Sequence, residues 1–181
     1  MLLTGPKHCG KTSAARALAA LRGGECRMAD LDWEIEKQTG KSPRALYTEG
    51  VEGFRAAETA ALERVLNAAA AAPESAPAVL ACGGGIIDNA AALTLLDEHK
   101  SRLKIVFLEI SAAAAWERLA ACGGELPPFL QTAANPKATH RALHRRRGTA
   151  YKKIAALTVN AEGKTPEQIA REIAARCYME S

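Results

Sequence analysis

Short apolar runs alternate along this chain with longer segments in which alanine and leucine recur at helical spacing. The runs are bounded by turn-forming residues, as buried strands are. Strands that alternate with amphipathic helices are typical of a parallel sheet covered on both faces. The sequence therefore predicts an α/β fold with a five-stranded parallel sheet, its strands at residues 1–4, 26–29, 78–82, 103–110 and 156–159.

Seven helices are predicted around these strands. Many of their positions are alanine, which favours helix and permits close packing against a sheet. Ser111 can cap one helix, and Thr165 can cap another that has Pro166 at its first helical position. The predicted helices cover residues 11–22, 31–39, 51–72, 89–99, 112–121, 136–153 and 166–178.

Three segments are predicted to be loops, at residues 73–77, 123–135 and 161–164. The second is long and contains paired glycines at 123–124 and paired prolines at 127–128. A long connection between two helices suits a lid over an active site, although a passive surface loop has the same composition.

The length, 181 residues, suits one domain, which we expect to span residues 1–181. Lysine and arginine outnumber aspartate and glutamate by 24 to 20, and the densest basic piece is Arg141 with residues 145–147. That cluster suits a solvated helix face or a phosphate or carboxylate site. Aromatic residues make up 4% of the chain and do not interleave with it, so we expect no nucleic-acid partner.

Five cysteines are scattered without C-x-x-C spacing, which indicates neither a zinc site nor a disulfide framework. Cys82 follows an apolar run and is expected in the core. No signal peptide precedes the first predicted strand, and no apolar run approaches about 18 residues. We therefore expect a cytoplasmic protein with reduced thiols and no membrane association.

Residues 5–12 read G-P-K-H-C-G-K-T and fit G-x-x-x-x-G-K-[ST] at every fixed position. A strand precedes this motif and a helix follows, so backbone N–H groups and the helix dipole can bind phosphate. Lys11 can reach the β- and γ-phosphates, and the Thr12 hydroxyl can bind Mg²⁺. We expect a nucleoside triphosphate and Mg²⁺ here; the alternative is a glycine loop that binds nothing. The predicted nucleotide-binding segment is Gly5, Pro6, Lys7, His8, Cys9, Gly10, Lys11, Thr12 and Ser13, with no chemistry assigned to the His8 and Cys9 side chains.

Two carboxylates, Asp30 and Asp32, stand at the end of the second predicted strand, at the sheet edge where ligands bind in such folds. One can hold hydrated Mg²⁺ while the other hydrogen-bonds a substrate hydroxyl. A simpler role for Asp32 is to cap the next helix, alone or in addition.

Three glycines, Gly83, Gly84 and Gly85, follow the third predicted strand and indicate a close approach of a ligand or another loop. Arg55 lies three residues before Glu58 on a predicted helix. This pair is either an ordinary surface ion pair or an arginine held in place to bind a substrate carboxylate.

Taken in order over about residues 2–160, these motifs resemble those of shikimate kinases. The family runs from a phosphate loop through D-x-D, I-E-x-x-x-G, G-E-x-x-F-R-x-x-E and G-G-G to a lid and R-x-P-L-Y. This chain has the phosphate loop at 5–12, Asp30 and Asp32, Ile35-Glu36 with Gly40, Gly50 with Phe54-Arg55 and Glu58, Gly83 to Gly85, and Arg147 with Tyr151.

The resemblance implies roles for individual residues. Lys11 would stabilise the transferring phosphoryl group, while Thr12 and, through water, Asp30 would hold Mg²⁺. Asp32 would orient the 3-hydroxyl of shikimate and could accept its proton.

The remaining implied roles concern binding of shikimate, the phosphoryl acceptor, and of the adenine ring of ATP. Arg55, Arg147 and the glycines at 83–85 would hold the shikimate carboxylate and ring, with Glu58 steadying Arg55. Arg118 would lie against adenine.

The chain departs from the family pattern in its lid. Where the family has R-P-L-L, residues 126–130 read L-P-P-F-L, so the lid arginine that meets the phosphates is absent. A missing cation can slow phosphoryl transfer by orders of magnitude. Either activity is reduced, or another cation substitutes, for which Arg141, Arg145 and Arg146 are candidates.

The sequence thus predicts a single-domain P-loop nucleoside-kinase-like fold. The resemblance implies that the protein phosphorylates shikimate at its 3-hydroxyl with ATP and Mg²⁺, in chorismate and aromatic amino-acid synthesis. We expect a monomer. The alternatives are another small-molecule kinase, such as a gluconate kinase, and a catalytically silent nucleotide-binding domain.

Overall fold

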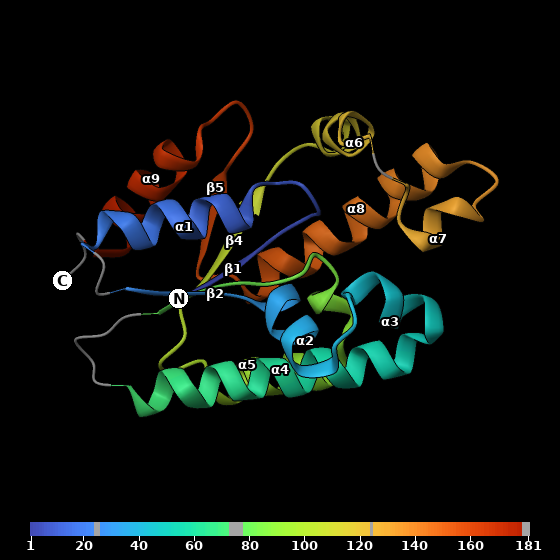
Figure 1. The fold of residues 1–181 in the computed structure, drawn as a ribbon. Coiled ribbons are helices and arrows are strands. Elements are labelled where there is room, and N and C mark those ends of the chain that lie inside the picture. Colours follow the sequence, from blue (N-terminus) through green and yellow to red (C-terminus); the bar gives the residue numbers. More distant parts are fainter. Residues whose placement is uncertain (24–25, 73–77, 124, 179–181) are drawn as a thin grey trace.

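The computed structural model describes residues 1–23, 26–72, 78–123 and 125–178 (Figure 1). Five strands in these ranges form one parallel sheet in the order β2-β3-β1-β4-β5, which confirms the predicted sheet. Their bounds are β1 (Leu2–Thr4), β2 (Arg27–Asp30), β3 (Ala78–Ala81), β4 (Ile105–Glu109) and β5 (Leu157–Asn160).

The seven predicted helices are present, with ends within one residue of those expected. Their bounds are α1 (Lys11–Leu21), α2 (Leu31–Thr39), α4 (Val51–Ala71), α5 (Ala90–Glu98), α6 (Ala112–Ala121), α8 (Pro136–Ile154) and α9 (Pro166–Tyr178). The predicted loop at 73–77 lies outside the described residues.

Three short helices were not predicted. They are α3 (Pro43–Glu49), the 3₁₀ helix η1 (Ile86–Asp88) and α7 (Pro128–Gln131), the last within the predicted lid loop. None is long enough to establish a helical period, and local caps and packing define them instead. The α3 helix, for example, begins with Pro43 after Ser42, whose side chain accepts a hydrogen bond from the Ala45 N–H.

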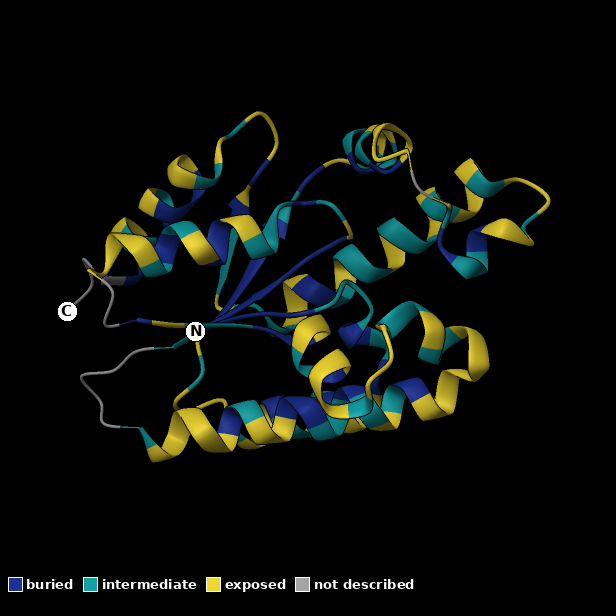
Figure 2. Cartoon of the chain, viewed as in Figure 1, coloured by how far each residue is buried: buried dark blue, intermediate teal, exposed yellow. Residues whose placement is uncertain are grey.

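The sheet separates two apolar cores because successive strand residues point to opposite faces. Leu3 of β1 belongs to the core beneath α1 and α9, whereas Leu2 belongs to the core beneath α2, α4 and α5. Figure 1 shows α1 and α9 on one face and α4 and α5 on the other, and Figure 2 shows the buried strands between them. The loops after the strands are thereby held on a rigid base.

Side-chain caps fix where several helices begin. Ser111 accepts from the Ala114 N–H at 3.1 Å and Thr165 from the Gln168 N–H at 3.3 Å, as expected. The suggestion that Asp32 caps α2 is wrong, because the cap is Asp30, whose Oδ1 accepts from the Asp32 N–H at 3.0 Å. The Asp32 side chain thus has no capping role at this helix end.

The structure also bears on the thiols and on membranes. Cys82 is 2% exposed, as expected of a core residue. Of the other cysteines, Cys122 is exposed, whereas Cys9, Cys26 and Cys177 are buried. In the part of the chain that the structure describes, no helix combines the length and the apolar character needed to span a bilayer.

Candidate active site

A cavity of about 780 Å³ opens at the carboxyl ends of β1, β2 and β3, the edge where ligands bind in open α/β sheets. Most of the predicted site residues line it: Pro6, Lys7, His8, Gly10, Lys11, Thr12, Ser13, Asp30, Asp32, Arg55, Glu58, Gly83, Gly84, Gly85, Arg118 and Arg147. Gly5 and Cys9 do not line it, and Cys9 is fully buried in the core behind the loop. The topology thus gathers residues from six separate segments of the chain around one space.

The phosphate-loop glycines have distinct structural tasks. Gly5 has φ +146°, and a Cβ added there would lie 2.5 Å from the Leu108 carbonyl oxygen. Gly10 has φ +96° and stands at the amino end of α1, where a left-handed residue lets the chain turn into the helix. The loop therefore leads directly from β1 into α1, as the motif predicts.

Lys11 and Thr12 follow this turn at the start of α1. The Lys11 Nζ donates to the carbonyl oxygens of Gly5 at 3.1 Å and Pro6 at 2.8 Å, so the ammonium group lies over its own loop. The Thr12 hydroxyl donates to Asp30 Oδ2 at 2.6 Å. Hydroxyl and carboxylate oxygens are the ligands that Mg²⁺ prefers, so this pair fits a magnesium ion.

Asp32 lies two residues beyond Asp30, in the first turn of α2, with its side chain open to the cavity. A Cβ added at Gly83 would lie 3.0 Å from Asp32 Oδ1, so the glycine turn passes against this carboxylate. Enclosure by the surrounding protein raises the pKa of Asp32, and the charge of Asp30 adds to this, while Lys11 acts in the opposite direction.

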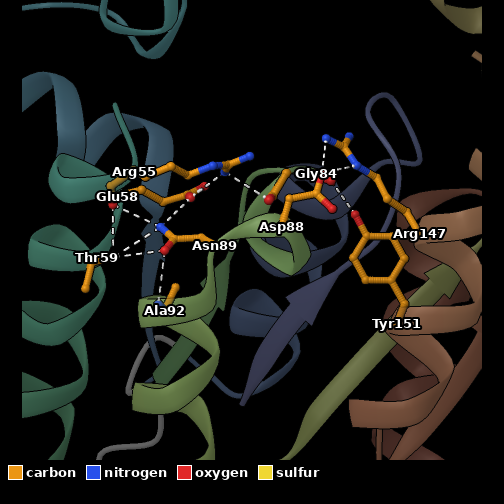
Figure 3. A network of polar contacts seen from close by, with 10 residues as sticks. Arg55, Glu58, Thr59, Gly84, Asp88, Asn89, Ala92, Arg147 and Tyr151 are labelled. Atoms are coloured by element: carbon orange, nitrogen blue, oxygen red, sulfur yellow. Dashed lines mark hydrogen bonds and ion pairs between the residues drawn. The ribbon is translucent and has the colours of Figure 1, made fainter. Parts of the chain in front are cut away.

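Arg55, on α4, is held by a buried polar network (Figure 3). Its Nη1 donates to Glu58 Oε2 at 2.7 Å and to the Gly85 carbonyl at 3.0 Å. Glu58 is 1% exposed and also accepts from Asn89 Nδ2 at 3.0 Å. The reading of Arg55 and Glu58 as a surface ion pair is wrong, because Glu58 is buried, Arg55 is partly buried and both line the cavity.

Asn89 was missed by the sequence reasoning, although its place before a run of alanines marks it as a helix cap. It caps α5 by accepting from the Ala92 N–H at 3.3 Å and also donates to the Arg55 carbonyl at 2.9 Å. One residue therefore fixes both the start of α5 and the carboxylate that holds Arg55.

Arg147, on α8, faces the same glycine turn from the opposite side. Its Nε and Nη2 donate to Asp88 Oδ2 at 2.9 Å and 2.7 Å. Arg146 contacts the other oxygen of that carboxylate at 2.8 Å. Partial burial raises the pKa of Asp88, but the hydrogen bonds and charges of the two arginines outweigh it and hold the pKa below its ordinary value. Asp88 was also missed, since nothing in its local sequence marks it as an arginine partner.

The glycine turn packs closely against these groups. A Cβ at Gly84 would lie 3.0 Å from the Lys7 backbone nitrogen, and one at Gly85 would lie 3.3 Å from Arg55 Nη1 and 3.6 Å from Arg147 Nη2. The close approach predicted from the glycine run is therefore present.

Tyr151 contacts both the glycine turn and the phosphate loop through its hydroxyl group. The ring is fully buried and stacks on Phe107 with 5.0 Å between centroids. Its hydroxyl donates to the Gly84 carbonyl, as Figure 3 shows, and lies 3.4 Å from the Gly5 carbonyl.

Arg118, on α6, contacts the phosphate loop from its outer side. Its Nη1 donates to the His8 carbonyl at 3.1 Å. Cys122, at the end of α6, has its sulfur 3.4 Å from His8 Nδ1. Burial lowers the pKa of His8, and the charges of Lys7 and Lys11 lower it further. The predicted place of Arg118 against adenine stays a prediction.

The basic cluster after the lid was expected to offer candidate cations in place of the missing lid arginine, but the three candidates do not line the cavity. Arg146 is engaged by Asp88, and none of Arg141, Arg145 and Arg146 is among the described residues that line the cavity.

A family model described as shikimate kinase matches residues 7–178. A shikimate kinase of Salinispora arenicola is 38% identical over 175 residues, which cover 96% of this chain and 95% of the relative. A shikimate kinase of Thermobifida fusca is 38% identical over 174 residues, covering 96% and 91%.

A solved structure is similar over the same extent. Shikimate kinase from Acinetobacter baumannii, in complex with shikimate, has a TM-score of 0.82 and 29% sequence identity. The similarity covers 99% of this chain and 93% of that one. Sequence and fold thus agree over almost the full length.

Proposed function

Because the chain belongs to the shikimate kinase family, we propose that it transfers the γ-phosphoryl group of ATP to the 3-hydroxyl of shikimate, giving ADP and shikimate 3-phosphate. This is a step of chorismate and aromatic amino-acid biosynthesis. The observation that carries the proposal is that Lys11, Asp32, Arg55 and Arg147 line one cavity. A phosphate-binding loop and a carboxylate-binding pair of arginines therefore face the same space.

The nucleotide side of the cavity is formed by the phosphate loop. Backbone N–H groups before α1 and the positive end of its dipole bind the phosphates. Lys11 exchanges its contacts with the loop carbonyls for phosphate oxygens when the nucleotide binds. The Thr12 hydroxyl and, through water, Asp30 would hold Mg²⁺, which would supply positive charge to neutralise the phosphates.

The acceptor side is formed by Asp32, the glycine turn and two arginines. Arg55 and Arg147 bind the shikimate carboxylate, and their acids, Glu58 and Asp88, fix the two guanidinium groups on either side of Gly85. Asp32, at the other end of the turn, accepts a hydrogen bond from the 3-hydroxyl.

The transfer follows from this placement. The 3-oxygen of shikimate bonds to the γ-phosphorus while the bond to the β,γ-bridging oxygen breaks, and ADP leaves with that oxygen. The hydroxyl proton passes to Asp32, whose raised pKa favours its acceptance. Positioning and charge stabilisation supply the rate, as in other phosphoryl transfers.

A coupled assay of ADP release tests the proposal with the purified chain, Mg²⁺ and ATP. Shikimate is expected to be turned over, whereas gluconate and nucleoside monophosphates are not. Turnover of gluconate instead would indicate the rival kinase. Calorimetric ATP binding with no turnover of any acceptor would indicate a silent domain.

Lys11→Ala checks the nucleotide side in the same assay. Turnover with shikimate should be almost abolished, because the cation that contacts the phosphates is lost. A near-normal kcat would contradict the loop assignment.

We further propose that residues 1–181 act as a single kinase domain, as a cytoplasmic monomer that binds no nucleic acid. Two features of the sequence support the expectation that no nucleic acid binds. The net charge is only +4, and the aromatic residues do not interleave with the basic cluster. Light scattering coupled to size exclusion tests the oligomeric state, and a second copy in the particle would refute it.

A further inference from the structure

Arg44 reaches from α3 across to the lid. Its Nη2 donates to Glu125 Oε2 at 2.6 Å and to the Leu126 carbonyl at 3.2 Å, and its Nη1 donates to the Glu125 carbonyl at 3.3 Å. The guanidinium group therefore lies against two consecutive lid residues. Arg44 also lines the cavity that contains Lys11.

The lid itself offers no positive charge to this cavity. Its described residues, 123 and 125–135, include neither lysine nor arginine. Lys11 is supplied from the start of α1, so phosphoryl oxygens directed away from the phosphate loop would need a cation from another element. The transferring group spreads its negative charge over those oxygens, and a planar guanidinium group matches them well.

The other cavity arginines are held by partners that fix them elsewhere. Arg55 is paired with the buried Glu58, Arg147 donates two hydrogen bonds to Asp88, and Arg118 donates to the His8 carbonyl. Each of these arginines therefore already has a partner that is not part of the lid.

The carboxylate partner of Arg44 is much more exposed to solvent than the carboxylates that hold Arg55 and Arg147. The Glu125 side chain is 77% exposed, so water can solvate it as soon as it is released. A phosphate group that enters the cavity can therefore take its place on Arg44 at little cost. The two contacts with lid carbonyls can persist and keep the guanidinium group beneath the lid.

We propose that Arg44 binds the terminal phosphoryl group of ATP during transfer and that Glu125 is its exchangeable partner in the nucleotide-free protein. This inference rests on the proposed kinase function. It places the cation that the lid lacks on α3, in the same cavity as the phosphate loop.

A different role for the same contacts is a latch, in which the Arg44–Glu125 pair only holds the lid against α3. The two roles make opposite predictions for Glu125. If Arg44 binds phosphate, Glu125 competes with the nucleotide and is dispensable. If the pair is a latch, Glu125 is needed as much as Arg44.

Steady-state kinetics with shikimate separate these roles. Arg44→Ala should lower kcat by about 10²- to 10³-fold, as loss of a donor to transition-state charge does. Arg44→Lys, which keeps the charge without the planar fork, should recover part of the loss. Glu125→Gln should retain the wild-type kcat. An Arg44→Ala kcat within twofold of wild type, or an equal loss in Glu125→Gln, overturns the proposal.

Lys41→Ala is the matched control, because Lys41 is an exposed cation beside α3 that pairs with Glu49 outside the cavity. It should leave kcat unchanged. Melting temperatures of all variants should agree with wild type, since both ion pairs are exposed. If Lys41→Ala lowered kcat as much as Arg44→Ala, the loss would reflect removal of any positive charge near α3, and the proposal would be overturned.

Nucleotide binding supplies a readout that does not depend on the acceptor. By calorimetry, Arg44→Ala should weaken a non-hydrolysable ATP analogue by about tenfold and leave ADP unchanged, because only the analogue carries the terminal phosphate. Equal weakening of both ligands, or of neither, overturns the proposal. If the wild-type chain binds the analogue but does not turn over shikimate, the proposed function fails while this comparison still decides the role of Arg44.

Discussion

Each arginine of the acceptor side is held by an acid that does not itself need to touch the substrate. Glu58 is 1% exposed and would be costly to bury without the hydrogen bonds from Arg55 and Asn89. These contacts fix the guanidinium group before a ligand arrives, so less side-chain entropy is lost when a carboxylate binds. At the scale of the residue, the site is thus preorganised by its carboxylates, the buried Glu58 and the partly buried Asp88.

Arg55→Ala tests this assignment. We expect KM for shikimate to rise by roughly tenfold to a hundredfold, the range of a lost hydrogen bond between charged groups, while KM for ATP changes little. Initial rates with each substrate varied in turn give both constants. The reverse pattern, with the larger change in KM for ATP, would place Arg55 on the nucleotide side.

A second prediction concerns the protonation of Asp32. Partial desolvation within the cavity and the charge of Asp30 raise its pKa above the ordinary 3.8, so on acidification Asp32 gains its proton at a higher pH than a solvated aspartate. Carbon-detected NMR titration of the carboxyl group should show this. In Asp30→Asn, loss of the neighbouring negative charge should lower the Asp32 pKa, and an Asp32 pKa at or below 3.8 in wild type would contradict the prediction.

At the scale of the element, the long helices and the strands were predictable and the short helices were not. The α1 and α4 helices repeat their apolar pattern over several turns, whereas α3, η1 and α7 have seven, three and four residues. Their positions depend on caps and on packing between distant segments. This matters for the site, because α3 carries Arg44, η1 ends with Asp88 and α7 lies in the lid.

Asn89 illustrates an element boundary that also builds the site. Asn89→Ala removes the cap of α5 and leaves Glu58 without one of its donors. We expect the free energy of unfolding, measured with urea, to fall by about 2–4 kcal/mol, the sum of a lost cap and an under-satisfied buried group.

Ser111→Ala is the control for that experiment. It removes the exposed cap of α6 and an exposed hydrogen bond to Glu162, and should cost about 1 kcal/mol. Equal losses in the two variants would mean that the contact between Asn89 and Glu58 adds nothing to stability.

At the scale of the whole molecule, the sheet order brings together what the sequence separates. The phosphate loop, the α2 start and the glycine turn follow β1, β2 and β3, which are neighbours in the sheet. Strand ends can be predicted from local pattern, so Lys11, Asp32 and Gly83 could be assigned from sequence. Asp88 and Arg44 could not, because their partners, Arg147 and Glu125, lie 59 and 81 residues away and no local pattern encodes the pairing.

Ligand binding should therefore stabilise the entire fold, since the cavity is built by segments on both cores. At a concentration 100 times its Kd, a ligand of the folded state adds about 2.7 kcal/mol, which for a chain of this size raises Tm by about 5–10 °C. ATP with Mg²⁺ should give such a shift in a thermal denaturation assay. Chelation of Mg²⁺ should reduce it, because the paired Thr12 and Asp30 oxygens then face the phosphates without the ion between them. An ATP shift that is the same with and without Mg²⁺ would argue against the assignment of Thr12 and Asp30 to the metal.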